Sequence, residues 1–421
     1  MSALVADLDR LTLLQTCLEQ GLTQPAVFEL VVRALPARRN FLVAAGLEQA
    51  LQFLKSLSFS EAEFAWLREQ GGFSATLLEY TRGLRFDGDV DAMPEGTVFF
   101  AGEPVLRVTA ALPLAMLVES RLLSLVHFET SIASSAARLV SAAGGRRLID
   151  TGLRQAHGAE AALLAARAAY LAGFDGTSTA DASRRFGIPA FGALGVRPFD
   201  AGISMLDAIA RTPAERVELL VGVDPSATPP QQLVELASAF GSDDTRRAGR
   251  QLDTGDIPTR ARALRRLLDA AGFASLGIFA SGALDEDGIA ALLVAAAPID
   301  GFGLGRWLSI ASDTGFVDAV YALQHYAASA GTTSAIVWPG ARNVVRRLGA
   351  GGRIEADLVM GEHEVGDREA LMQPCMRAGK RVGRTPTLQE SRAYCTRQIA
   401  SLPEPLQHLQ PATEAVAVTT R

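Results

Sequence analysis

From about residue 146 onward, short apolar stretches alternate with segments in which apolar residues have helical spacing. The apolar stretches recur at intervals of roughly 25–30 residues and are short enough for buried strands. We expect strands at residues 147–150, 174–177, 190–194, 217–223, 249–253, 276–281 and 299–302. Such alternation predicts parallel strands joined by helical crossovers, in either a barrel or an open sheet.

Two of the intervening helices have clear boundary signals. One begins at Asp256 and ends at Gly272, and the next begins at Asp285 and stops before Pro298. We interpret Asp285 and Glu286 as residues that only cap their helix, since acidic groups stabilise its positive end.

Small and polar residues gather where the predicted strands end. They occupy positions 150–152, 176–178, 192, 253–256, 281–282 and 303–305. In a parallel barrel all of these ends share one face, which is where such barrels place their active sites. The pattern therefore favours an α/β fold with a barrel, of irregular form, over an open sheet.

The flanking segments have a different pattern. The expected elements are a strand at 25–32, a helix at 43–56, two strands at 96–100 and 104–108 joined by a turn at Gly102, and one or two long helices at 113–143. After residue 330, a Gly/Pro-rich stretch precedes a region rich in Arg and Gly. These segments do not continue the strand–helix alternation.

The composition excludes several classes of protein. The chain has 421 residues, of which 48% are hydrophobic and 20% charged, so a disordered chain is excluded. A net charge of −6 without blocks of like charge gives no basic face for nucleic acid. Neither Lys55 nor Lys380, the two lysines, lies in the Gly-Lys-Ser/Thr triplet of a Walker loop. Phosphate would instead be held by backbone amides and arginine forks.

The location is predicted from cysteines and apolar runs. The three cysteines lie far apart without a CxxC pair, which fits a reducing cytoplasm. The N-terminus becomes charged before any apolar stretch develops, so no signal peptide is visible. The longest apolar run, near residues 289–299, is too short to cross a bilayer. We expect a soluble cytoplasmic protein without a membrane partner.

Residues 303–306, Gly-Leu-Gly-Arg, form the best candidate for a phosphate-binding loop. Two glycines allow close approach to backbone amides, although a simple tight turn is the alternative. Ser281-Gly282 strengthens the assignment, because adjacent barrel strands commonly build such a site together. Asp253 and Asp256 could bind ribose hydroxyls or Mg²⁺, with helix capping as the alternative for Asp256.

Two further observations concern charge and metal ligands. Arg154, at the top of the first barrel strand, could fork a carboxylate or a phosphate, or simply lie at the surface. The five histidines have no metal-ligand spacing, so no protein-bound metal is predicted.

Several segments resemble motifs of the nicotinate phosphoribosyltransferases, in order along essentially the whole chain. Residues 150–158 resemble FGxRRAxG, 173–178 GFxGTSN, 252–256 LDSGD, 280–286 SGxLDE and 299–305 IDxFGVG; at the flanks, 7–12, 28–46 and 338–346 also agree. The resemblance implies a type II phosphoribosyltransferase. Its barrel is expected at 131–330, beside a second α+β domain in which segment 331–421 packs on segment 1–130.

The resemblance also implies an activity. Such enzymes transfer 5-phosphoribosyl from phosphoribosyl diphosphate (PRPP) to nicotinate, or here to a related carboxylated ring, and release pyrophosphate. They are usually homodimers and hold no tight cofactor, although Mg²⁺ can accompany PRPP. Transfer to a different acceptor in a biosynthetic cluster, or a catalytically inactive paralogue that binds ribose phosphate, are the alternatives.

Matched residue by residue, the motifs imply roles for individual side chains. Arg154 is expected to contact the base carboxylate or the diphosphate, and Asp253 the ribose or the base, as the catalytic pair. Thr177 and Ser178 are expected near base and ribose. The residues expected to hold the 5-phosphate are Ser281, Gly282, Gly303 and Gly305.

The chain departs from the family pattern at ligand positions. Val196 stands where the family has the histidine that is phosphorylated during ATP coupling, so coupling of that kind is not expected. The other departures are Asp9, Gln155, Thr179 and Gln251. Arg197 and Arg306 are additional cations that could bind substrate and replace the positive charge missing at 155 and 251; the alternative is that both are surface arginines.

Overall fold

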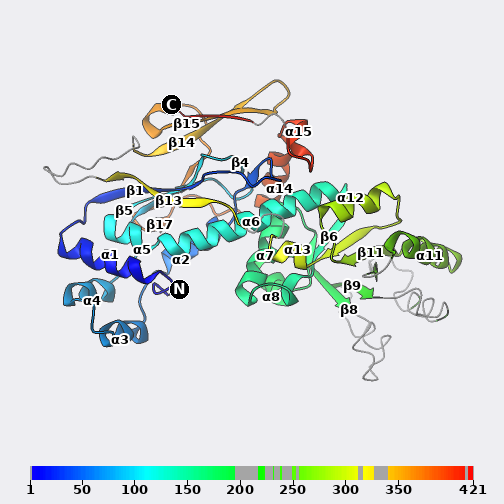
Figure 1. Cartoon of the computed structure of the whole chain (residues 1–421), viewed down its shortest axis with the longest axis horizontal. Coiled ribbons are helices and arrows are strands. Elements are labelled where there is room, and N and C mark those ends of the chain that lie inside the picture. Colours follow the sequence, from blue (N-terminus) through cyan, green and yellow to red (C-terminus); the bar gives the residue numbers. More distant parts are fainter. Residues whose placement is uncertain are drawn as a thin grey trace. The chain divides into compact units, whose positions relative to one another are not determined.

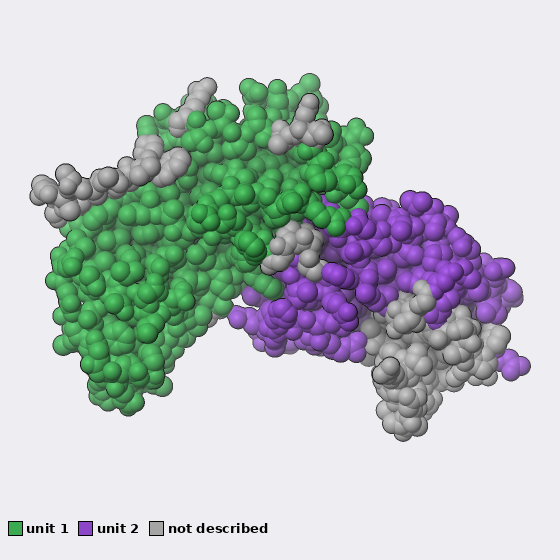
Figure 2. Space-filling model, viewed as in Figure 1, with its two compact units in different colours: residues 1–131, 316–421 green, residues 132–315 purple. Residues whose placement is uncertain are grey.

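The computed structural model describes residues 2–194, 217–222, 231, 238, 249–252, 256–311, 316–326, 340–412 and 416–420. The chain divides into two compact units, one formed by residues 1–131 with 316–421 and the other by residues 132–315 (Figure 2). Helix α6 (Glu119–Ala143) contributes residues to both units (Figure 1).

The second unit contains the predicted barrel. Its strands are β6 (Arg147–Asp150), β7 (Gly176–Thr177), β8 (Ala190–Leu194), β9 (Val217–Gly222), β10 (Gly249–Leu252), β11 (Gly277–Gly282) and β12 (Gly301–Leu304). They close in the order β10-β11-β12-β6-β7-β8-β9, and each pair is parallel. The prediction of a parallel α/β barrel is confirmed. Two strands begin two residues later than expected: β7 at Gly176 and β12 at Gly301.

Helices connect these strands as the alternation predicts. They are α7 (Ala159–Ala172), α8 (Ala180–Phe186), α11 (Ile257–Ala270), α12 (Glu286–Val294) and α13 (Arg306–Ser309), with a 3₁₀ turn η1 (Gly152–Arg154) after β6. The Asp256 and Asp285 side chains accept hydrogen bonds from backbone amides in the first turns of α11 and α12, so both cap their helices. Glu286 does more than cap, contrary to expectation. It is buried and forms an ion pair with Arg138 of α6 at 3.0 Å.

The barrel is filled by aromatic and aliphatic side chains. Ile149, Phe191 and Phe279 form a buried cluster, and because they come from strands that are not neighbours, they meet in the interior. A Cβ atom on Gly176 would overlap the ring of Phe191, and one on Gly301 would overlap the ring of Phe279. Glycine at these two strand positions therefore makes room for the rings.

The first unit is built on a six-stranded sheet in the order β13-β1-β5-β3-β16-β17. Its strands are β1 (Pro25–Val32), β3 (Asp89–Ala92), β5 (Pro104–Ala111), β13 (Ala319–Tyr326), β16 (Gln373–Arg377) and β17 (Lys380–Arg381). Early and late segments of the chain pair here, β1 with β13 and β3 with β16. Strand β13 lies before residue 330 and was therefore expected in the barrel, but the structure places it in this sheet.

Smaller elements complete the first unit. They are the pair β2 (Leu42–Val43) and β4 (Val98–Phe99), the sheet β14 (Arg342–Leu348), β15 (Ile354–Gly361) and β18 (Ala417–Thr420), and the helices α1 (Leu8–Glu19), α2 (Leu47–Lys55), α3 (Glu61–Glu69), α4 (Ala75–Arg82), α5 (Leu112–Leu117), α14 (Leu388–Ala400) and α15 (Glu404–Gln407). The two strands flanking Gly102 belong to different sheets, and helix α2 begins at Leu47 rather than residue 43. No helix among the described residues is long and apolar enough to cross a membrane.

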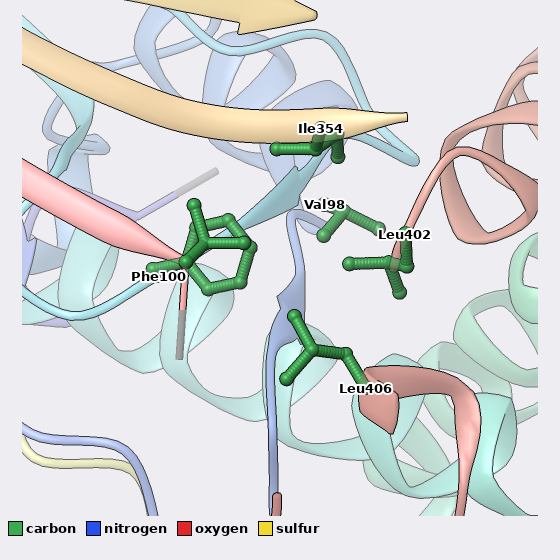
Figure 3. Packing of buried hydrophobic residues seen from close by; sticks show 6 residues of the cluster. Val98, Phe100, Ile354, Leu402 and Leu406 are labelled. Carbon is green, nitrogen blue, oxygen red and sulfur yellow. The ribbon is translucent and has the colours of Figure 1, made fainter. Parts of the chain in front are cut away.

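A hydrophobic cluster joins early and late segments of the first unit. Val98 and Phe100 pack against Ile354, Leu402 and Leu406 (Figure 3). Residues more than 250 positions apart in the sequence thus share one core.

A buried acid pair lies in the same unit, with Asp357 on β15 and Glu103 directly before the start of β5. The Arg346 guanidinium contacts the Asp357 carboxylate, and Asp357 also interacts with Glu103, which is fully buried. Burial, together with the neighbouring Asp357 charge, raises the pKa of Glu103 well above its usual value. Two carboxyl groups therefore share the Arg346 cation, and burial disfavours a second negative charge at Glu103.

Candidate active site at the ends of the barrel strands

Four neighbouring barrel strands end in register. Gly282 of β11 pairs with Leu304 of β12, Leu304 with Asp150 of β6, and Asp150 with Thr177 of β7. One residue earlier, Ser281 pairs with Gly303. The structure thus brings the two predicted phosphate turns onto the adjacent strands β11 and β12. Strand β7 lies two strands from β12, and its end is on the same edge of the barrel.

The two turns differ in exposure. Ser281 is buried, whereas Gly282 is exposed and has a φ of 111°, in a region that side-chain-bearing residues rarely adopt. Gly303 and Gly305 are buried, and Arg306 is exposed at the start of α13. Backbone groups of the first turn are therefore at the surface, and the exposed Arg306, which begins α13, makes no hydrogen bond or ion pair with any described residue.

The turn after β12 is locked to the turn after β6. The Thr151 amide donates to the Leu304 carbonyl at 2.8 Å. The Ser309 hydroxyl lies 2.9 Å from the Gly305 carbonyl and 3.3 Å from that of Gly152. A Cβ atom on Gly305 would lie 3.1 Å from the Thr151 carbonyl oxygen, so close packing alone already favours glycine there.

Asp150 links the turn after β6 to the segment after β7. Its carboxylate accepts from the Gly152 amide at 2.9 Å and from the Thr177 hydroxyl at 2.6 Å. The side chain is buried, and burial raises its pKa to about 6, while the two hydrogen bonds act in the opposite direction. The sequence pattern places Asp150 at a strand end and assigns it no role of its own. An acid that ends a buried strand directly before Thr-Gly was the available signal.

The predicted binding residues near Asp150 are presented differently. Thr177 is buried, and its hydroxyl is engaged by Asp150 and by the Thr179 amide at 3.0 Å. Ser178 is only partly buried. Arg154, the last residue of η1, is exposed and makes no hydrogen bond or ion pair with any described residue. Its guanidinium is therefore available to an anionic ligand.

Two predicted site residues, Asp253 and Arg197, lie outside the described residues, as does Val196. Leu252, which precedes Asp253 in the sequence, pairs with Ala280, the residue before Ser281. Within the described part of the chain, no group of three or more His, Cys, Asp or Glu side chains is arranged to hold a metal ion.

Family models match both ends of the chain. The N-terminal domain of nicotinate phosphoribosyltransferase matches residues 4–127, and its C-terminal domain matches residues 366–421. A nicotinate phosphoribosyltransferase of Mycobacterium tuberculosis is 39% identical over 424 residues, covering 97% of this chain and 89% of the relative. A second one from the same organism is 33% identical and covers 100% and 95%.

Solved structures show the same fold. Human nicotinic acid phosphoribosyltransferase matches with a TM-score of 0.75 and 22% identity, covering 98% of this chain and 97% of that one. A nicotinate-nucleotide pyrophosphorylase from Pyrococcus furiosus matches with a TM-score of 0.72 and 22% identity, covering 95% of each chain. The likeness therefore extends through both units and is not confined to the barrel.

Proposed function

Because the chain belongs to the nicotinate phosphoribosyltransferase family, we propose that it transfers the 5-phosphoribosyl group of PRPP to nicotinate and releases pyrophosphate. Identity of 39% across nearly the whole length supports this activity. Neither a transferase with a different acceptor nor an inactive paralogue gains support from the relatives. The observation that carries the proposal is the alignment of both glycine turns on neighbouring strands at the edge of the barrel.

The chemistry fits such a site. Displacement at the anomeric carbon of the ribose passes through a cation-like transition state, with pyrophosphate as the leaving group. The protein must align the nitrogen of the ring with this carbon and stabilise the leaving diphosphate, without a strong protein nucleophile. Arginines and backbone amides meet these needs at the barrel edge.

The 5-phosphate is proposed to bind at the turns formed by Ser281-Gly282 and by Gly303 to Gly305. The pairing of Ser281 with Gly303 supports this assignment, because one phosphate can reach amides from both turns only when they are adjacent. Arg306, exposed directly after Gly305, adds a positive charge. Arg197, which is outside the described residues, is assigned the same part.

Nicotinate is proposed to meet Arg154. A guanidinium can form two parallel hydrogen bonds with a carboxylate, and such charge-assisted pairs are among the strongest in proteins. The absence of any described protein partner for Arg154 supports this role. Ser178 and Asp253 are assigned to the ribose and the base, with the Thr177 hydroxyl already engaged by the protein.

The remaining parts of the proposal concern assembly and coupling. We assign a homodimer in the cytoplasm, with Mg²⁺ entering as the companion of PRPP. Val196 cannot accept a phosphoryl group, so turnover is proposed to proceed without a phosphohistidine.

The test is an assay of pyrophosphate release and nucleotide formation with the full-length protein, PRPP and Mg²⁺. Nicotinate and other carboxylated rings serve as acceptors, together with nicotinamide, which lacks the carboxylate. Each is tested with and without ATP. We expect nicotinate mononucleotide from nicotinate, at a rate that ATP does not raise. Absence of product with every acceptor would refute the transferase, and ATP stimulation through a phosphorylated protein would refute the uncoupled mechanism.

A further inference from the structure

Asp150 lies between two segments that carry predicted ligand groups. It ends β6, its exposed fraction is 2%, and its two carboxylate oxygens accept hydrogen bonds from different segments. A buried carboxylate is costly unless hydrogen bonds compensate for the lost water. The role of Asp150 at the barrel edge therefore depends on the two segments that donate hydrogen bonds to it.

On one side, the carboxylate holds the turn that carries Arg154. The Gly152 amide donates to Asp150 Oδ1 at 2.9 Å. The Gly152 carbonyl then accepts from the amides of Gln155 and Ala156, at 2.9 and 3.0 Å. The start of the turn is thus fixed by Asp150, and the placement of Arg154 two residues later depends on it.

On the other side, Asp150 holds the last residue of β7 and the two residues that follow it. The Thr177 hydroxyl donates to Oδ2 at 2.6 Å and accepts from the Thr179 amide at 3.0 Å. The backbone carbonyl of Asp150 accepts from the Ser178 amide at 2.8 Å. Side chain and main chain of one residue therefore set the position of Ser178.

We propose that Asp150 is a positioning residue of the transfer reaction, which fixes Arg154 and Ser178 relative to each other. This inference rests on the proposed function. An ionised carboxylate can accept from both donors at once, whereas asparagine has only one acceptor oxygen and would turn an NH₂ group toward the other donor. A displacement of about 1 Å at a reacting group can reduce turnover about 100-fold. The hydrogen bonds that Asp150 accepts from both segments therefore affect the rate.

The test compares Asp150→Asn, Asp150→Ala, Thr177→Val and the double variant Asp150→Ala/Thr177→Val. We expect kcat to fall about 10-fold for Asp150→Asn and about 100-fold for Asp150→Ala, because alignment is lost in steps. KM for PRPP should change less than kcat, since the Asp150 carboxylate makes no hydrogen bond to the described residues of the turns assigned to the 5-phosphate. The double variant should lose less than the product of the two single losses, because both changes break the hydrogen bond between Thr177 and Asp150.

Glu286→Gln is the matched control. Glu286 is also a buried carboxylate of the barrel unit, but it is paired with Arg138 between helices. This control should lower the unfolding midpoint and leave kcat unchanged at temperatures where the protein is folded. A kcat loss in Glu286→Gln equal to that in Asp150→Asn would overturn the inference, because it would reflect general destabilisation.

Other outcomes separate the inference from the proposed function. If the wild-type protein forms nucleotide and folded Asp150→Asn keeps the full kcat, the positioning role is wrong. If the wild-type protein forms no nucleotide, the proposed function fails. Unfolding free energies of the variants then test whether Asp150 holds the two segments together. Strictly additive losses for Asp150→Ala and Thr177→Val would overturn it, whereas a double variant that loses less stability than the sum of the two single losses would support it.

Discussion

Gly152→Ala tests how tightly the turns after β6 and β12 are locked together. An added Cβ atom would overlap the Ser309 hydroxyl and lie 3.0 Å from Asp150 Oδ1. Ser309 is buried with its hydroxyl 2.9 Å from the Gly305 carbonyl, so it cannot move aside without losing that contact. Gly152 does not have a positive φ, so the substitution tests packing and not backbone strain.

The expected cost follows from two terms. Overpacking a filled site costs about 1–3 kcal/mol, and a lost buried hydrogen bond adds about 1 kcal/mol. We therefore expect Gly152→Ala to lower the unfolding free energy by about 2–4 kcal/mol. Ser309→Ala alone should cost about 1 kcal/mol. The double variant should cost less than the sum by about 1–3 kcal/mol, because removing the hydroxyl makes room for the new methyl group.

The assay is urea unfolding in a Trp66→Phe/Trp338→Phe background. Of the three tryptophans, Trp307 then remains, and it lies in α13 beside Ser309. Its fluorescence reports the barrel unit, which keeps a separate transition of the other unit from distorting the fit. Additive losses for the two single variants, or a cost below about 0.5 kcal/mol for Gly152→Ala, would refute the interlocked geometry.

Three further predictions use other contacts. Arg154→Lys should lower kcat/KM for nicotinate about 10- to 100-fold, because a lysine cannot fork the carboxylate, while the exposed Arg184→Ala should not; equal effects in steady-state kinetics would contradict the assignment. Glu286→Gln should cost about 3–5 kcal/mol in urea unfolding and Arg138→Met/Glu286→Leu much less, since removing one partner of a buried ion pair costs more than replacing both by apolar side chains; a double variant as unstable as the single would be inconsistent with this. The raised pKa of Glu103 means that the folded protein keeps a proton that the unfolded chain releases, so the unfolding free energy should fall as pH rises above about 4.5. Glu103→Gln should reduce that slope in thermal melts across pH and leave the part that the raised pKa of Asp150 causes, and an unchanged slope would show that Glu103 does not contribute to it.

The barrel could be predicted because its signals are local. Each strand and the small residues at its end are visible within windows of about ten residues, and the alternation of such strands with helices predicted the correct sheet type. The capping roles of Asp256 and Asp285 were likewise predictable, since a cap contacts only its own helix.

What could not be predicted depends on distant pairing. Asp150 meets Thr177 because β6 and β7 pair in one register, and Glu286 meets Arg138 across 148 positions of sequence. Strand β13 follows the barrel in sequence yet pairs with β1, almost 300 residues earlier. Neither composition nor periodicity indicates which distant residues come into contact. Glu286 is therefore predicted only as a cap, and β13 as part of the barrel.

A crystal structure of the protein with nicotinate mononucleotide tests the central claim most directly. We predict the 5-phosphate within hydrogen-bond distance of backbone amides from both turns, those following Ser281 and Phe302, with the ring carboxylate at Arg154. A nucleotide whose phosphate binds away from those two turns would contradict the account, even if the protein proved to be an active transferase.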